Sequence, residues 1–286
     1  SVYSMLASSS DFFRVYIFLK AQCFCIVFVV TPNIFLIEML LVRPIVVDFY
    51  KMGTLNHIFN IITSVFFFVN IFGNMMMSIL TDTKLRKSEE NGIYCEYCKL
   101  KRPVNSWHCS TCNACILRRD HHCSIMSRCI GLNNHRYFVL YMFYLAVSMV
   151  YSTYFNFYFV RTKFEDYGMI VSLLRIMNPF RFMSVPFNEP EEWYRTHSLP
   201  PLGMKDLYLF FFSWNVLMML WSCFYFVYHM KNVLQGVTVY ESRHRSDLDY
   251  SKWKENFLHV FGVKWYLAFI CPFATSPVPY KSSIKP

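Results

Sequence analysis

The chain alternates between long apolar stretches and polar segments that carry most of its charge. A run of about 20 apolar residues is long enough to cross the hydrocarbon core of a bilayer as a helix. Runs of this kind occur at residues 23–42, 58–80, 137–160 and 207–228. The pattern therefore predicts an all-α membrane protein with four transmembrane helices.

The polar segments between these spans divide the chain into five parts. In chain order the expected parts are 1–22, 23–80 with helices 1 and 2, 81–136, 137–228 with helices 3 and 4 around the loop 161–206, and the tail 229–286. Within the loop, residues 169–185 are apolar but too interrupted to span, so we expect them to lie at the membrane surface.

The composition supports a membrane protein over a nucleic-acid binder. Hydrophobic residues make up 55% of the chain and charged residues 16%, whereas an ordinary soluble domain is more highly charged. The formal net charge of +10 raises the possibility of a zinc-ribbon protein that binds nucleic acid. The basic residues are scattered beside apolar spans instead of being gathered on one polar face, which argues against that class.

Seven of the eleven cysteines and three of the nine histidines fall between Cys95 and Cys129. Paired C-x2-C motifs with a nearby histidine have the spacing of zinc ligands, because two thiolates on one turn can reach the same tetrahedral ion. The alternative is a disulfide knot, which interleaved histidines disfavour. We therefore expect residues 81–136 to form a zinc-binding domain between helices 2 and 3.

Two closed tetrahedral sites need eight ligands, and this segment offers ten. One thiol and one imidazole are left over, and we expect them in the run Asp120-His121-His122-Cys123. A thiol beside an imidazole that is itself beside a carboxylate is the arrangement of an activated cysteine nucleophile. The spacing alone leaves open that all four residues are structural.

The distribution of positive charge predicts the orientation of the chain. Lys and Arg number ten in residues 81–136 and eight in 230–286, against two in 43–54 and six in 161–206. The positive-inside rule therefore places the cysteine-rich domain and both termini in the cytosol and the loop 161–206 in the lumen. A reducing compartment also suits a cluster of free thiols. The first span lacks a small-residue cleavage site, so we expect it to be retained.

The segment from Cys95 to Phe138 resembles the cysteine-rich domain of the DHHC protein S-acyltransferases, or palmitoyltransferases, at every defining Cys, His, Asp, Asn and Phe. The resemblance implies that Cys123 carries the acyl group, with His121 as its base and Asp120 as the orienting group. It implies two structural zinc ions with four ligands each: Cys95, Cys98, His108 and Cys115 for one, and Cys109, Cys112, His122 and Cys129 for the other.

The activity that the resemblance implies is transfer of a long-chain acyl group from acyl-CoA, most often palmitoyl-CoA, to the enzyme's own cysteine and then to cysteines of substrate proteins. The expected partners are the lipid bilayer and cytosol-facing proteins with membrane-proximal cysteines, with no nucleic acid. The family default for location is the Golgi or the endoplasmic reticulum. Cations that could meet the phosphates of CoA are Arg118, Arg119, Arg128 and Lys231.

Several positions depart from the pattern of this family. Ser124-Ile125 stands where the family usually has Pro-Trp, and Asp82-Thr83 where it usually has Asp-Pro-Gly. The tail resembles the family's Thr-Thr-x-Glu motif from Thr238 to Glu241, with valine in place of the second threonine, and a later Asn-containing motif around Asn256. These departures leave a second hypothesis, a catalytically silent relative that acts as a membrane scaffold or as the partner of another acyltransferase.

Overall fold

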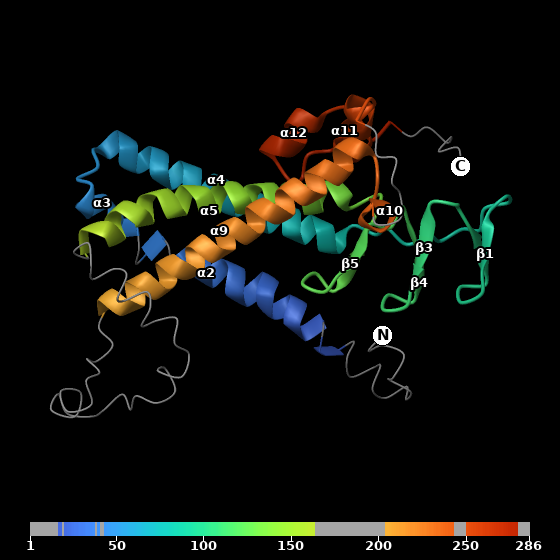
Figure 1. Ribbon diagram of the computed structural model, residues 1–286, viewed down its shortest axis with the longest axis horizontal. Helices are drawn as coiled ribbons and strands as arrows, with labels where there is room; N and C mark the ends of the chain where they lie inside the picture. Colours follow the sequence, from blue (N-terminus) through green and yellow to red (C-terminus); the bar gives the residue numbers. More distant parts are fainter. Residues whose placement is uncertain are drawn as a thin grey trace.

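The computed structural model describes residues 17–18, 20–37, 39–40, 43–163, 204–242 and 250–279 (Figure 1). The surface segment expected at 169–185 lies outside these residues, as does most of the loop 161–206.

Three long helices form the membrane part of the described chain: α4 (Thr54–Leu80), α5 (His135–Lys163) and α9 (Met204–Gln235). Helix α5 packs against both α4 and α9, and the three run side by side (Figure 1). Each contains a segment long and apolar enough to cross a membrane, at Thr54–Leu80, His135–Phe157 and Phe211–Gln235. These helices contain the second, third and fourth spans that the sequence predicts.

The count of four spans is not confirmed. The described residues of the expected first span form a π-helical segment, η2 (Cys25–Val30), and then α2 (Thr31–Ile37), before α3 (Arg43–Phe49). Pro32 stands at the change from π- to α-helix, where a residue without a backbone N–H interrupts the regular hydrogen-bond ladder. Among the described residues, no single helix here is long enough to count as a span.

The all-α class is not confirmed either, because the cysteine-rich segment contains six short strands. They pair as three antiparallel hairpins, β1 (Ile93–Cys95) with β2 (Leu100–Arg102), β3 (Ser106–Cys109) with β4 (Ala114–Leu117), and β5 (His121–Cys123) with β6 (Arg128–Ile130). The hairpins lie beyond one end of the helices, with β5 nearest to them (Figure 1).

The three hairpins share one plan. The first strand of each ends at a cysteine, Cys95, Cys109 or Cys123, and the partner strand begins five residues later. The last turn residue has a left-handed backbone in all three, with φ of 53° at Lys99, 45° at Asn113 and 48° at Ser127. A left-handed residue closes a tight turn so that the chain can return in register. Turns of this shape present thiols and backbone N–H groups to one point.

Three short helices follow α9 in the described residues, at the same end of the molecule as the hairpins: α10 (Val239–Ser242), α11 (Trp253–Phe261) and α12 (Trp265–Ile270) (Figure 1). Asn256 of α11 donates from Nδ2 to the carbonyl oxygen of Leu234 at 2.9 Å. It also lies against Gly236, whose φ of +70° ends α9, and a Cβ there would come within 2.6 Å of the Asn256 side chain. The Asn256 motif thus fixes the end of α9.

The largest group of buried apolar side chains lies where the helices meet the third hairpin. It joins residues of α4, α5 and α9 to the hairpin and to α11, and includes Met75, Met126, Ile130, Phe138, Val139, Leu140, Val233 and Phe261. This core holds the β5–β6 hairpin directly against the membrane helices.

Candidate active site and metal centres

The first Cys/His cluster joins the β1–β2 and β3–β4 hairpins. Cys98 Sγ lies 3.2 Å and Cys95 Sγ 3.8 Å from Nδ1 of His108. Cys115 completes the group, in which all donor atoms lie within 4.8 Å of one another. His108 and Cys115 are cross-strand partners, so pairing of β3 with β4 brings them together.

The second cluster repeats the first one hairpin further along the chain. Nδ1 of His122 lies 3.7 Å from Cys109 Sγ, 3.3 Å from Cys112 Sγ and 3.6 Å from Cys129 Sγ. His122 and Cys129 face each other across β5 and β6, as His108 and Cys115 do across β3 and β4.

Both clusters fit a closed zinc site. Zinc bonds of about 2.3 Å to sulfur and about 2.0 Å to nitrogen place tetrahedral ligand atoms roughly 3.5–3.8 Å apart, close to the distances in both groups. All eleven cysteines are free thiols in the structure, so no disulfide competes for them. The two groups are the ones that the resemblance implies, and each offers three thiols and one imidazole, the four ligands of a closed site.

The third hairpin explains why one thiol is left over. Cys123 ends β5 as Cys95 ends β1 and Cys109 ends β3, but Met126 stands where the other turns carry Cys98 and Cys112. The cysteine turns recur every 14 residues. Cys123 thus occupies a ligand position in a turn that lacks its second thiol, and it belongs to neither metal cluster. The 14-residue repeat is a signal that the sequence analysis missed.

Cys123 forms a linked group with His121 and Asp120. Nδ1 of His121 donates to Oδ2 of Asp120 at 2.8 Å, and the Cys123 thiol lies close enough to His121 for each group to shift the pKa of the other. Burial opposes ionisation of Cys123, but the hydrogen bond and charge of His121, with backbone N–H groups of Met126 and Ile125, lower its pKa below the ordinary thiol value. The backbone N–H groups of this turn therefore point to the Cys123 thiolate, in the same way that those of the zinc-ligand turns point to a ligand sulfur.

The same hydrogen bond acts in the opposite direction on the imidazole. Burial disfavours the cation of His121, but the bonds to Asp120 and Cys123 raise its pKa to about 9. Burial would likewise raise the pKa of Asp120, yet the bond from His121 and the nearby imidazoles hold it well below its usual range. The geometry thus favours a thiolate, an imidazolium and a carboxylate in a row.

The second oxygen of Asp120 is held from the tail. The backbone N–H of Val239, the first residue of α10, donates to Oδ1 at 2.8 Å. A capping box sets up this helix end: the N–H of Thr238 donates to Oε2 of Glu241 at 2.8 Å, and the N–H of Glu241 donates to Oγ1 of Thr238 at 3.2 Å. Thr238 and Glu241 therefore place a backbone donor, and the side chain at position 239 takes no part in the bond.

The profile of the family described as DHHC palmitoyltransferase matches residues 88–246, more than half of this chain. The chain belongs to the DHHC palmitoyltransferase family. The family match covers all three hairpins, the described parts of α5 and α9, and α10.

Curated relatives agree with this assignment. The palmitoyltransferase ZDHHC17 of Rattus norvegicus is 44% identical over 62 residues, which cover 22% of this chain and 10% of the relative. ZDHHC20-A of Danio rerio is 44% identical over 61 residues, covering 21% of this chain and 16% of the relative. The akr1 palmitoyltransferase of Emericella nidulans is 37% identical over 62 residues, covering 22% and 8%. The chain thus matches less than a fifth of the length of each of these relatives.

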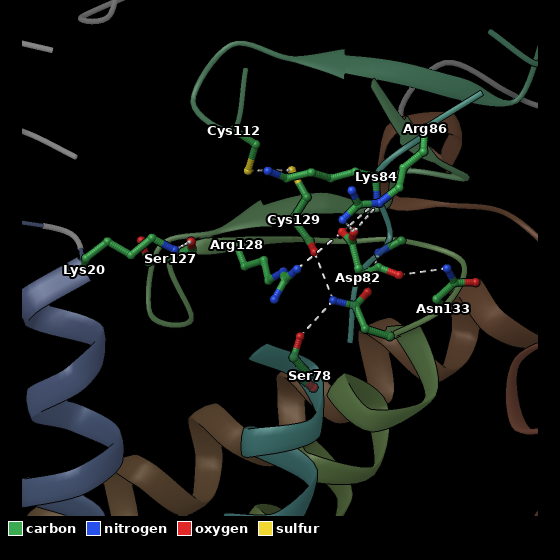
Figure 2. Close-up of polar contacts among 12 residues, drawn as sticks. Lys20, Ser78, Asp82, Lys84, Arg86, Cys112, Ser127, Arg128, Cys129 and Asn133 are labelled. Atoms are coloured by element: carbon green, nitrogen blue, oxygen red, sulfur yellow. Dashed lines mark hydrogen bonds and ion pairs between the residues drawn. The ribbon is translucent and has the colours of Figure 1, made fainter. Parts of the chain in front are cut away.

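Asp82, which stands at the start of the position where the family usually has Asp-Pro-Gly, ties α4 to the cysteine-rich domain (Figure 2). The carboxylate of Asp82 accepts from Arg86 and, at 3.4 Å, from Arg128, the cross-strand partner of Cys123. The Asp82 carbonyl accepts from Nδ2 of Asn133 at 2.8 Å.

A group of buried hydrogen bonds, made by Asn134, lies beside the more exposed contacts of Asp82. Nδ2 of Asn134 donates to the carbonyls of Ser78 at 2.9 Å and Cys129 at 3.0 Å, and its Oδ1 accepts from the N–H of Gly131 at 2.8 Å. One side chain thereby fixes the strand that carries Cys129 to the end of α4. The asparagine of the DHHC motif therefore has a structural role in this chain.

The four basic residues that the sequence suggested for binding the phosphates of CoA differ in whether they already have a structural contact. Arg118 donates to the carbonyl of Gly236 at 3.0 Å, Arg119 contacts the carbonyl of His108 at 3.4 Å, and Arg128 pairs with Asp82. Lys231 is exposed. Three of the four therefore have structural contacts that hold the domain together.

Proposed function

We propose that this chain is a membrane-embedded protein-cysteine S-acyltransferase, with Cys123 as nucleophile, His121 as base and Asp120 as the group that orients His121. The observation that carries this proposal is the row Cys123–His121–Asp120, in which His121 is hydrogen-bonded to Asp120 and interacts with Cys123, in a turn whose thiol belongs to neither metal cluster. A cysteine with only a structural role needs no depressed pKa and no buried carboxylate behind its base.

The donor that fits this site is a long-chain acyl-CoA. Cys123 packs against the apolar cluster at the ends of α4, α5 and α9, so a thioester formed on it would have its acyl chain beside the membrane helices. Cys123 sulfur attacks the thioester carbonyl, the new C–S bond forms, and the bond to CoA breaks as CoA leaves as a thiol. A substrate cysteine then attacks the acyl-Cys123 carbonyl and returns the enzyme thiol, with His121 moving the proton in each step.

Two groups of four residues are proposed to hold zinc: Cys95, Cys98, His108 and Cys115, and Cys109, Cys112, His122 and Cys129. Closed sites of this kind contribute metal-binding free energy to folding and leave no open position for substrate. His122 and Cys129 flank the Cys123 hairpin on both strands, so filling the second site would rigidify the turn that holds the nucleophile.

The proposed substrates are proteins whose cysteines lie close to the cytosolic surface of a Golgi or endoplasmic reticulum membrane. The positive-charge asymmetry supports a cytosolic cysteine-rich domain and lumenal residues 161–206. The lengths of the apolar runs support the proposed division of the chain into residues 1–22, 23–80, 81–136, 137–228 and 229–286. Protease treatment of sealed microsomes tests the orientation with tags at residue 87 and within 161–206. We expect cleavage only at the first tag, and protection of that tag would reverse the orientation.

The proposed activity is tested by incubating the purified chain with a clickable acyl-CoA and treating half of the sample with hydroxylamine, which cleaves thioesters. We expect a hydroxylamine-sensitive label on the native chain and none on Cys123→Ser with two zinc ions still bound. Cys223→Ser, on α9, is the matched control and should label normally. No label on a folded, zinc-loaded native chain would refute the activity.

The scaffold hypothesis remains as a second candidate because Ser124-Ile125 replaces Pro-Trp directly after the nucleophile. These two residues begin the turn 124–127, and Ile125 is 37% exposed, so they face solvent or substrate and are not buried in the core. If the native chain takes no acyl group, the double variant Ser124→Pro, Ile125→Trp decides the cause. If that variant is labelled, the inactivity of the native chain is caused by Ser124-Ile125 in this turn.

A further inference from the structure

A buried histidine on the last membrane helix lies against the proposed catalytic row. His229 of α9 stands 109 positions after Asp120 in the chain, yet its Nδ1 lies 3.6 Å from Oδ2 of Asp120. The side chain is 4% exposed, and Asp120 is completely covered. Neither the cysteine-rich motif nor the tail motif includes this residue. The two four-ligand clusters do not contain it either, although its imidazole forms a third group of possible metal ligands with Asp120 and His121.

The oxygen that faces His229 is the one that already binds His121. Oδ2 of Asp120 accepts from His121 at 2.8 Å, and Oδ1 accepts from the N–H of Val239 at 2.8 Å. A buried carboxylate has room for more than two donors, and additional donors stabilise its charge. Two further imidazoles, those of His135 and His229, act on Asp120, and the Nδ1 of His229 lies 3.6 Å from the carboxylate.

Nδ1 of His229 is buried and makes no hydrogen bond among the described residues. A proton on Nδ1 would point at the Asp120 carboxylate, whereas a lone pair there would face negative charge, so the environment favours the tautomer with Nδ1–H. The separation of 3.6 Å is longer than a hydrogen bond, and catalytic hydrogen bonds commonly shorten when substrate is bound.

The ring of His229 also limits where His121 can lie. The three rings of His121, Phe138 and His229 form a mutual packing group, with centroids 4.9 Å apart for His121 and Phe138, 4.8 Å for Phe138 and His229, and 5.4 Å for the two histidines. His121 is therefore enclosed by Phe138 from α5, by His229 from α9 and by its own bond to Asp120.

We propose that His229 is a positioning residue for the Asp120–His121–Cys123 row. Its Nδ1–H is a third donor for Asp120, and its ring packs against one side of the His121 ring. This inference rests on the proposed function for its catalytic meaning. It couples α9, a membrane helix, to the reactive turn, so that a shift of α9 alters the orientation of the base.

The test replaces His229 in the zinc-loaded full chain. His229→Leu keeps an apolar side chain of similar bulk but removes the donor, and His229→Asn keeps an N–H group near the position of Nδ1. Asn232→Leu, one turn further along α9, is the matched control, because it also replaces a buried polar side chain that has an unpartnered nitrogen.

Two rates are measured: autoacylation at saturating acyl-CoA, and alkylation of Cys123 by iodoacetamide, which involves no acyl donor. His229→Leu should slow autoacylation by about tenfold, the effect of losing one hydrogen bond to a charged group. Alkylation should slow by a smaller factor, because at 3.6 Å the contact in the free enzyme is longer than a hydrogen bond. Both zinc ions should be retained. His229→Asn should recover most of each rate, and Asn232→Leu should retain the native rates.

The two readouts separate this inference from the proposed activity. A native chain that is alkylated quickly but never acylated refutes the activity, and the alkylation series still decides the role of His229. Equal rates in the native chain and His229→Leu overturn the inference, as does equal loss in His229→Leu and His229→Asn, which would mark a structural role. A third zinc ion that disappears in His229→Asn would also overturn it, because His229 would then be a metal ligand.

Discussion

The backbone N–H of Val239 donates a 2.8 Å hydrogen bond to Oδ1 of Asp120, across 119 positions of the chain. The bond places the amino-terminal end of α10 behind the carboxylate that orients His121. Because the donor is backbone, valine in place of the family's second threonine leaves the bond intact. This departure is therefore weak evidence for a catalytically silent protein.

This bond gives the first prediction. Val239→Pro removes the N–H, and proline is tolerated at the first position of a helix, so α10 should still form. A hydrogen bond to a charged group contributes about 1.5–3 kcal/mol, so autoacylation should fall roughly tenfold or more. Val239→Thr keeps the N–H and should label at the native rate. A normal rate in Val239→Pro would show that the tail does not support Asp120.

Metal content gives the second prediction. Cys98→Ser and Cys112→Ser each remove one ligand from a different cluster, so each variant should retain one of two zinc ions in elemental analysis. Both should unfold at a lower temperature, because zinc binding contributes to the free energy of folding. Cys271→Ser lies outside both clusters and should retain two ions. Loss of both ions from Cys98→Ser would mean that the two sites are not independent.

The adjacent histidines give the third prediction. In the native chain, Cys123 should be half-maximally alkylated at a pH below the ordinary thiol pKa of 9.0. In His121→Ala burial remains while the hydrogen bond and positive charge are lost, so this midpoint should move upward and the zinc content should stay at two. His122→Ala should lose one zinc ion instead. Identical behaviour of the two variants would contradict the division of roles between them.

The attachment of α4 to the cysteine-rich domain gives the fourth prediction. Asp82 is partly exposed, and exposed ion pairs contribute about 0–1 kcal/mol, so Asp82→Asn should change the free energy of unfolding by less than about 1 kcal/mol. Asn134→Ala removes three hydrogen bonds to buried backbone groups, and a buried group left unpaired costs about 1–3 kcal/mol. Thermal unfolding of the two zinc-loaded variants should therefore show a much larger decrease for Asn134→Ala. A reversed order would place the main attachment at the surface.

Local patterns in the sequence were informative at the metal clusters and in the membrane helices. The C-x2-C pairs and histidines predict ligands for two tetrahedral sites, and the resemblance to the DHHC family divides them into two groups of four. The structure brings the same two groups together. Long apolar runs predict helices in a bilayer because every backbone group must be hydrogen-bonded within its own segment. Three of the four expected spans fall in such helices, and the DHHC assignment is confirmed by the family match.

The hairpins were not predicted, although their signal was present. The cysteine turns recur every 14 residues, and Met126 breaks the repeat at the position that would otherwise bind metal together with Cys123. The prediction of an all-α protein was wrong because it was based on the apolar spans alone. In the cysteine-rich segment the ligand-bearing turns, and not long apolar runs, determine the structure, and each turn joins two short strands.

The family and three of the membrane helices could be predicted from the sequence, because each depends on residues close together in the chain or on a single long run. The tertiary structure decided what surrounds Asp120. Val239 and His229 reach it from more than 100 residues away, one through a backbone N–H that has no side-chain signature and one from an apolar helix. Such contacts exist only once α9 and α10 have packed against the third hairpin.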